Sequence, residues 1–161
     1  MPGEKIVNWR KLNINRDRRF EGLIESLNSL DTPIFTYIKD IMVFAAMVGY
    51  SENSRRSITK SGSIPILLET YATDQKDSFI YLLALMESKD ATLLKDENLS
   101  NALVIFEEFC NGGLYIIESW IEAKPADSPI DIILSNIYDK LIESESSDFA
   151  IDNSALKLPD I

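Results

Sequence analysis

The sequence contains no histidine and only one cysteine, Cys110. Histidine is the commonest general base of enzymes and the commonest ligand of transition metals in proteins, so its absence removes both roles. One cysteine cannot form a disulfide within the chain, and without histidine it cannot complete a structural zinc site. We therefore predict neither a bound metal nor any other cofactor.

Long apolar segments and phosphate-binding glycine motifs are also missing. The apolar stretch from Ile41 to Tyr50 is bounded by Asp40 and Glu52 and is too short to span a bilayer. The N-terminal residues include basic side chains but no apolar signal-peptide core, so we expect a cytoplasmic protein with no membrane association. The glycines of Asn111-Gly112-Gly113 lack the spacing and the following lysine of a P-loop or a dinucleotide turn.

Catalysis would have to depend on Cys110 or on paired carboxylates. Apolar neighbours predict that Cys110 is a buried thiol in a reducing compartment, which disfavours a nucleophile. The adjacent acids Glu107-Glu108 and Asp96-Glu97 suit acid/base chemistry or Mg²⁺ binding, but neighbouring residues on a helix point in different directions. We expect that the protein is not an enzyme, and a carboxylate- and Mg²⁺-dependent DNA-processing subunit is the alternative.

Charge is divided unevenly along the chain, whose formal net charge is −10. Residues 1–62 contain ten basic and seven acidic residues, whereas residues 63–161 contain six lysines and nineteen acids. The first part contains every arginine of the chain, at Arg10, Arg16, Arg18, Arg19, Arg55 and Arg56. Because guanidinium groups bind phosphate bidentately, this part is the better candidate for an anion-binding surface. The alternative is that these arginines pair with the acidic part or are merely solvated.

Apolar spacing predicts a mainly α-helical protein. Apolar side chains recur at helical intervals in residues 16–30, 37–50, 74–88, 96–110, 114–123 and 129–143. Ser128 and Pro129 are a typical N-cap and first residue for the last of these helices. Asn111, Gly112 and Gly113 predict a structural turn between two helices, and Gly49 predicts the end of an earlier one. The segment 63–66 is too short to assign.

Length and composition predict one compact domain. A chain of 161 residues with 45% hydrophobic residues can bury a core without a disulfide or a metal. We predict a single multi-helix domain over residues 1–143, with a basic part at 1–62 and an acidic part at 63–143. An acidic, flexible tail rich in serine, aspartate and glutamate is predicted over residues 144–161.

Polar and apolar side chains alternate from Arg10 to Asn15, which indicates a short strand before two helices. This is the order of ribbon-helix-helix modules, in which the strands of a homodimer enter the major groove of DNA. The base-edge readers of such a module would be Arg10, Asn13 and Asn15. Its phosphate contacts would be Arg16, Arg18 and Arg19, with Arg55 and Arg56 as further DNA-binding candidates. The alternative is an N-terminal arm that packs on the domain.

Two short blocks of sequence form a further pattern. The first is Phe44-Ala45-Ala46-Met47-Val48-Gly49-Tyr50, followed by Arg55-Arg56, and the second is Phe106-Glu107-Glu108-Phe109-Cys110-Asn111-Gly112-Gly113-Leu114. Together they resemble the bacterial family called DNA phosphorothioation-associated protein 4, or Dnd system-associated protein 4. The second family block reads Phe-Glu-Glu-Tyr-Ala-Asn-Gly-Gly-Leu, so Phe109 and Cys110 depart from it. The resemblance runs from about Asn13 to Leu141.

The resemblance implies a role beside gene clusters that replace a non-bridging phosphate oxygen of DNA with sulfur, or that restrict DNA lacking this mark. It provides no catalytic residues. We accordingly expect a non-catalytic accessory or regulatory protein that contacts other proteins of a modification or restriction system and binds DNA through its basic part. A purely structural adaptor without affinity for DNA is the remaining alternative.

Overall fold

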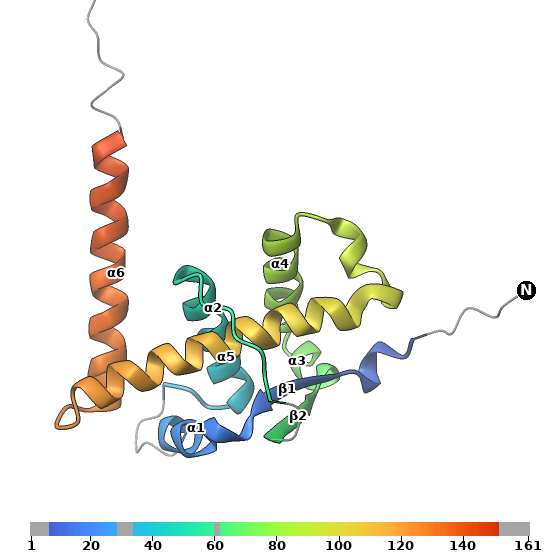
Figure 1. Cartoon of the computed structure of the whole chain (residues 1–161), viewed down its shortest axis with the longest axis horizontal. Coiled ribbons are helices and arrows are strands. Elements are labelled where there is room, and N and C mark those ends of the chain that lie inside the picture. Colours follow the sequence, from blue (N-terminus) through green and yellow to red (C-terminus); the bar gives the residue numbers. More distant parts are fainter. Residues whose placement is uncertain (1–6, 29–33, 60–61, 152–161) are drawn as a thin grey trace, which may run out of the picture. The chain divides into compact units, whose positions relative to one another are not determined.

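Helices dominate the structure, so the predicted mainly α-helical class is confirmed. The computed structural model describes residues 7–28, 34–59 and 62–151, which belong to two compact units, Met1–Glu118 and Ser119–Ile161. The elements of the first unit are η1 (Trp9–Lys11), β1 (Asn13–Asp17), η2 (Arg18–Phe20), α1 (Glu21–Asn28), α2 (Ile38–Ser51), β2 (Ser63–Leu67), α3 (Leu68–Ala72), α4 (Asp77–Ser88), η4 (Ala91–Leu94), η5 (Asp96–Asn98) and most of α5 (Leu99–Ala123). The second unit contains the end of α5 and α6 (Pro129–Ile151) (Figure 1).

The two strands form an antiparallel pair within the chain. Ile14 lies opposite Ile66, and Asn15 lies opposite Pro65. Pro65 has no N–H to donate, and the N–H of Asn15 is bonded to Glu107 of α5 instead, so this pair needs no ladder hydrogen bond. The strand begins later than predicted, because residues 9–11 form a 3₁₀ turn. Since β1 finds its partner in the same chain, it differs from the strand of a ribbon-helix-helix module, which pairs with a second subunit.

α5 provides much of the core of the first unit. Its buried side chains include Leu103, Phe106, Phe109, Cys110, Leu114 and Ile117. The Cys110 Sγ lies 3.5 Å from the Met42 Sδ of α2, and the Phe106 ring packs edge-on against Tyr71 of α3. The prediction that Cys110 is buried is therefore confirmed.

The predicted turn at Asn111, Gly112 and Gly113 is wrong, because α5 continues without a break from Leu99 to Ala123. Figure 1 shows it as one continuous helix. The three residues lie in the buried middle of the helix, where a packing contact, not a change of chain direction, requires the glycines. A Cβ on Gly112, for example, would lie 2.0 Å from the carbonyl oxygen of Ser54.

A similar close contact with a backbone explains Gly49, which was predicted to end a helix but lies inside α2. A Cβ on Gly49 would lie 2.0 Å from the carbonyl oxygen of Phe109, and a Cβ on Gly113 would lie 1.7 Å from that of Ala45. Each helix thus presents a glycine to the backbone of the other. Only glycine permits so close an approach, because its hydrogen can face the carbonyl oxygen where a Cβ cannot fit.

Other predicted boundaries shift for identifiable reasons. The helix predicted to begin at residue 16 starts at Glu21, because β1 and η2 take up residues 13–20. α4 begins at Asp77, since the side chain of Asp74 forms ion pairs with Lys39 and Lys76 and does not cap the helix. The break predicted at residues 31–33 lies outside the described residues.

In the second unit, α6 begins at Pro129 as predicted, and the N–H of Ile132 donates to the carbonyl of Ser128 at 3.0 Å. The helix continues past the predicted end at residue 143 to Ile151. Residues 152–161 of the predicted tail lie outside the described part of the chain. Among the described helices, none has the length and apolar character needed to cross a bilayer.

Candidate nucleic-acid interface

Arginines from two distant segments lie together on the first unit. The guanidinium of Arg19, in η2, lies 4.4 Å from the centre of the Tyr115 ring on α5, and that of Arg56, after α2, lies 4.3 Å from the same centre. Arg18 and Arg55 are the chain neighbours of these two residues. We call Arg18, Arg19, Arg55 and Arg56 the arginine surface.

Tyr115 is the side chain that joins the two segments. Its ring meets the buried ring of Phe20 edge to face, with centroids 4.8 Å apart, and Phe20 also lies under the guanidinium of Arg19. A guanidinium over an aromatic face gains about 0.5–1 kcal/mol at an exposed site. These contacts restrain two long cationic side chains while leaving Arg19 and Arg56 exposed to solvent.

Hydrogen bonds from the main helix fix the backbone beneath the arginines. The buried Asn111 Nδ2 donates to the carbonyls of Arg56 and Ser57, at 3.3 and 3.1 Å, and the N–H of Arg56 donates to the carbonyl of Glu108 at 3.0 Å. In the other segment, Asp17 Oδ1 accepts from the N–H of Arg19 at 3.0 Å. Both segments are therefore held at defined positions.

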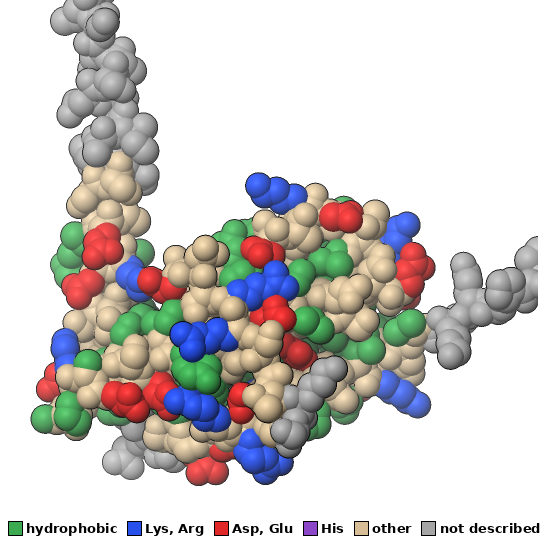
Figure 2. Space-filling model, in the orientation of Figure 1, with side chains coloured by type: hydrophobic (Ala, Val, Ile, Leu, Met, Phe, Trp, Pro, Cys, Tyr) green, Lys and Arg blue, Asp and Glu red, His purple; other side chains and the backbone are tan. Residues whose placement is uncertain are grey.

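The arginines differ in how far carboxylates neutralise them. Arg19 is paired with Glu118 at 2.9 Å, and Arg55 is paired with Glu108 and with Glu87, the latter at 3.2 Å. Arg18 and Arg56 are exposed and have no ion pair with any residue that the structure describes. The face drawn in Figure 2 shows the same intermixing of basic and acidic side chains.

Two of the predicted DNA contacts are used inside the fold. Arg16 is only 7% exposed and forms a bidentate pair with Glu21, at 2.7 and 3.3 Å. Asn15 donates its side-chain amide and its backbone N–H to Glu107 Oε1, at 2.9 and 2.6 Å. In this arrangement the Arg16 guanidinium is committed to a carboxylate and is nearly closed off from solvent.

The remaining two predicted contacts lie away from the arginine surface. Arg10 is exposed on η1 and approaches Glu69 to 3.7 Å. Asn13 is exposed at the start of β1, opposite Leu67, whereas Arg18 follows the other end of this strand. The structure thus brings Arg19 and Arg56 together at Tyr115, with Arg18 and Arg55 as their chain neighbours. Tyr115, which joins them, was not predicted, because no local pattern links a tyrosine on α5 to arginines far away in the sequence.

The acidic pair Glu107-Glu108 does not converge on one point. Glu107 accepts hydrogen bonds from Asn15, whereas Glu108 pairs with Arg55, so the two carboxylates serve different neighbours. Within the described residues, no group of three or more cysteine, aspartate and glutamate side chains is placed to hold a metal ion.

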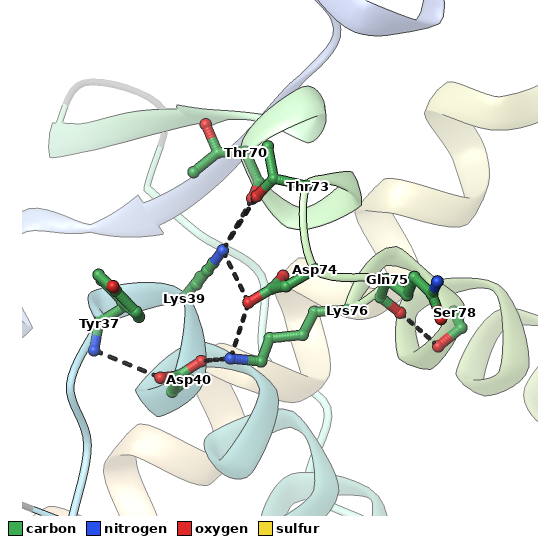
Figure 3. A network of polar contacts seen from close by, with 9 residues as sticks. All are labelled: Tyr37, Lys39, Asp40, Thr70, Thr73, Asp74, Gln75, Lys76 and Ser78. Carbon is green, nitrogen blue, oxygen red and sulfur yellow. Dashed lines mark hydrogen bonds and ion pairs between the residues drawn. The ribbon is translucent and has the colours of Figure 1, made fainter.

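A second polar cluster joins α2 to the start of α4 (Figure 3). The ammonium group of Lys39, 8% exposed, donates to the Thr70 carbonyl at 3.0 Å and to Thr73 Oγ1 at 3.3 Å, and it pairs with Asp74 at 2.9 Å. Lys76 bridges Asp74 and Asp40. A cavity of about 590 Å³ adjoins Lys39, but all three ammonium protons already have acceptors, so we interpret this cluster as a structural tie.

Comparison with known proteins gives one family. The model of the family described as DNA sulphur modification system-associated protein 4 matches residues 13–154. No curated protein and no solved structure matches the chain significantly.

Proposed function

The chain belongs to the family of DNA sulphur modification system-associated protein 4, and from this premise we propose that it is a non-catalytic accessory protein that binds DNA through the arginine surface. The family links the chain to a DNA sulphur modification system. Proteins of that system are accordingly its proposed partners.

One observation supports the DNA-binding part most directly. Arg18 and Arg56 come from distant segments, are both exposed, and have no carboxylate partner among the described residues. An exposed, unpaired guanidinium can bind phosphate bidentately without first losing an internal ion pair. Arg19 and Arg55 would add to this contact, because they are exposed and their carboxylate pairs are weak in water.

An exposed apolar stripe on α4 supports the proposed protein contacts. Phe79, Leu82 and Met86 are exposed and recur at spacings of three and four residues, so they share one face of the helix. Exposed apolar side chains grouped in this way are typical of protein interaction sites. The proposal therefore assigns DNA contact to the arginine surface and protein contact to α4.

A titration of labelled duplex DNA, followed by fluorescence anisotropy, tests the DNA-binding part. We expect weak, salt-dependent binding, which the triple variant R18A/R19A/R56A reduces by about tenfold to a hundredfold because it removes three phosphate contacts. The matched control K89A/K95A/K124A also removes three exposed charges but leaves the arginine surface intact, and it should bind nearly as the natural protein does.

Equal losses in the two triple variants would show that binding reflects overall charge and not this surface. If the natural protein shows no salt-dependent binding at all, the DNA-binding proposal is wrong and the structural adaptor is favoured. Hydrolysis of the DNA that depends on added Mg²⁺ would instead favour the DNA-processing alternative.

A further inference from the structure

A pocket of about 340 Å³ lies beside the arginine surface. The residues that line it are Asn15, Ser57, Ile58, Ser63, Val104, Glu107 and Glu108. They come from β1, the segment after α2, the start of β2, and α5. The arginine surface lies on the segment after α2 and on η2, which directly follows β1. Neighbouring segments of the fold thus form both the pocket and the arginine surface.

Three arginines lie close to residues that line this pocket. Arg55 bonds to Glu108, which lines the pocket, and Arg56 is followed directly by the lining residues Ser57 and Ile58. On the other side, Asp17 is paired with the lining residue Ser63, and Arg18 follows Asp17. A ligand held by Arg18 or Arg55 would therefore lie next to the pocket mouth.

The interior of the pocket has a distinct chemistry. Glu107 Oε1 accepts two hydrogen bonds from Asn15, whereas its Oε2 accepts none from the residues that the structure describes. Val104, 44% exposed, and Ile58 add apolar walls. The pocket thus offers an open acceptor beside apolar surface, which suits a flat ligand that donates hydrogen bonds.

The charges around the pocket favour a base inside it and phosphates outside it. The carboxylates of Glu107 and Glu108 repel a phosphate from the pocket, and the arginines outside attract it. A base is uncharged, and the exocyclic amino group of adenine, cytosine or guanine can donate to a carboxylate. Burial also raises the pKa of Glu107, although hydrogen bonds from Asn15 oppose this shift.

We propose that this pocket receives one amino-bearing base of a nucleic-acid strand, while the arginine surface binds the adjoining phosphates. The inference rests on the proposed DNA binding and adds the part of the ligand that is recognised. A base inside the pocket must be unstacked, which costs a few kcal/mol in a duplex and little in a single strand. The protein should therefore bind single strands more tightly than duplexes of the same length.

The test compares two single-stranded oligonucleotides, one of adenine nucleotides and one abasic at every position, in anisotropy titrations. The natural protein should bind the intact strand about tenfold more tightly than the abasic strand, because a base contact adds to the phosphate contacts. Val104→Trp fills the pocket from an exposed position, and Glu107→Gln replaces the open acceptor with a donor. Both variants should lose most of this preference while binding the abasic strand no more weakly than the natural protein does, and Glu107→Gln, which removes a negative charge, should bind it slightly more tightly.

The outcomes separate this inference from the proposed function. Equal binding of the intact and abasic strands by the natural protein, or an undiminished preference in both variants, would overturn the pocket while leaving phosphate binding in place. Binding of neither strand would overturn both proposals. Circular dichroism and thermal unfolding verify that each variant is folded, and loss of folding in one leaves the other to decide.

Discussion

At Gly113, a single hydrogen atom decides whether two helices can touch. The residue faces the backbone of α2 at a distance that excludes any side chain. Gly22, on α1, offers a matched contrast, because a Cβ added there meets nothing within 4 Å. Substituting each glycine in turn therefore distinguishes the effect of close helix packing, at Gly113, from the general cost of glycine in a helix, at Gly22.

We expect Gly113→Ala to lower the free energy of unfolding by about 2–3 kcal/mol, since α2 and α5 must move apart to admit the methyl group. Gly22→Ala should raise the free energy of unfolding by about 0.5–1 kcal/mol, because alanine favours the helix. Urea denaturation followed by circular dichroism measures both changes. Similar effects of the two substitutions would show that the close contact is not present in solution.

The buried hydroxyl of Tyr71 and the buried thiol of Cys110 make the stability of the fold depend on pH. Tyr71 is fully buried, and its hydroxyl has no hydrogen-bond partner among the described residues. Burial raises the pKa of Tyr71 well above its ordinary value of 10.0, and burial likewise raises the pKa of the Cys110 thiol above 9.0. Both groups therefore stay protonated in the folded protein at pH values where the unfolded chain loses the protons.

Stability should consequently be lost as pH rises above about 9, because the unfolded state then binds fewer protons than the folded state. Each such group contributes a loss of about 1.4 kcal/mol per pH unit above its ordinary pKa. Thermal unfolding between pH 7 and pH 11 measures this decline. Tyr71→Phe should make the decline shallower above pH 10, whereas Tyr37→Phe, at a side chain that is 58% exposed, should not. An unchanged decline in the Tyr71 variant would contradict the explanation.

At the scale of elements, α5 holds the segment that carries Arg55 and Arg56. Asn111 is the residue through which it does so, since its amide donates to two successive carbonyls of that segment. Asn136 on α6 is a useful contrast, because its amide donates to the Ile132 carbonyl of its own helix and, among the described residues, to no distant segment. The first hydrogen bonds join distant parts of the chain, and the second does not.

Asn111→Ala should release the segment around Arg55 and Arg56 and leave two carbonyls without a donor, at a cost of about 1–3 kcal/mol. Limited trypsin digestion detects the change as faster cleavage after Arg55 or Arg56. Asn136→Ala should leave this cleavage rate unchanged. Equal rates in the natural protein and the Asn111 variant would mean that these hydrogen bonds do not restrain the segment.

The elements also show what sequence patterns can and cannot predict. α2, α4 and α6 were predicted because their apolar side chains recur within one helix, where local spacing is sufficient. The continuity of α5 was not, since Gly112 and Gly113 suggest a local turn when the partner helix is unknown. β2 was left unassigned for a similar reason: its partner β1 lies far away in the sequence, and Pro65 interrupts the pattern.

The candidate site was likewise predictable from the sequence only in part. Composition confined the arginines to the first part of the chain, and two of them from distant segments, Arg19 and Arg56, do lie together on one ring. Which arginines remain accessible depends on tertiary pairing, as the burial of Arg16 against Glu21 shows. Neither the role of Tyr115 nor the pocket at Glu107 has a local signature, because each requires several segments that are distant in the sequence.

At the scale of the whole molecule, a net charge of −10 opposes any contact with a polyanion. If DNA binds at the arginine surface, repulsion from the acidic remainder of the protein limits the contact to a few phosphates. The number of these contacts fixes the salt dependence of binding, because each one releases condensed counterions from the DNA.

For about four phosphate contacts, log Kobs should fall with log salt concentration with a slope of about −3.6 on duplex DNA. The R18A/R19A/R56A variant should reduce the slope to about −1, and K89A/K95A/K124A should preserve it. Titrations at several salt concentrations provide these slopes. A slope beyond about −6 would require more cationic contacts than the arginine surface contains.

The glycine contacts that join α5 to α2 and to the segment after α2 also have a consequence for how the sequence can evolve. Gly49, Gly112 and Gly113 each face a backbone carbonyl of the opposing segment, and a backbone cannot be made smaller by substitution. A larger residue at one position therefore has no compensating replacement at another. Among homologues these three glycines should each stay invariant without covarying with any partner, while the side chains that pack around them drift in correlated pairs.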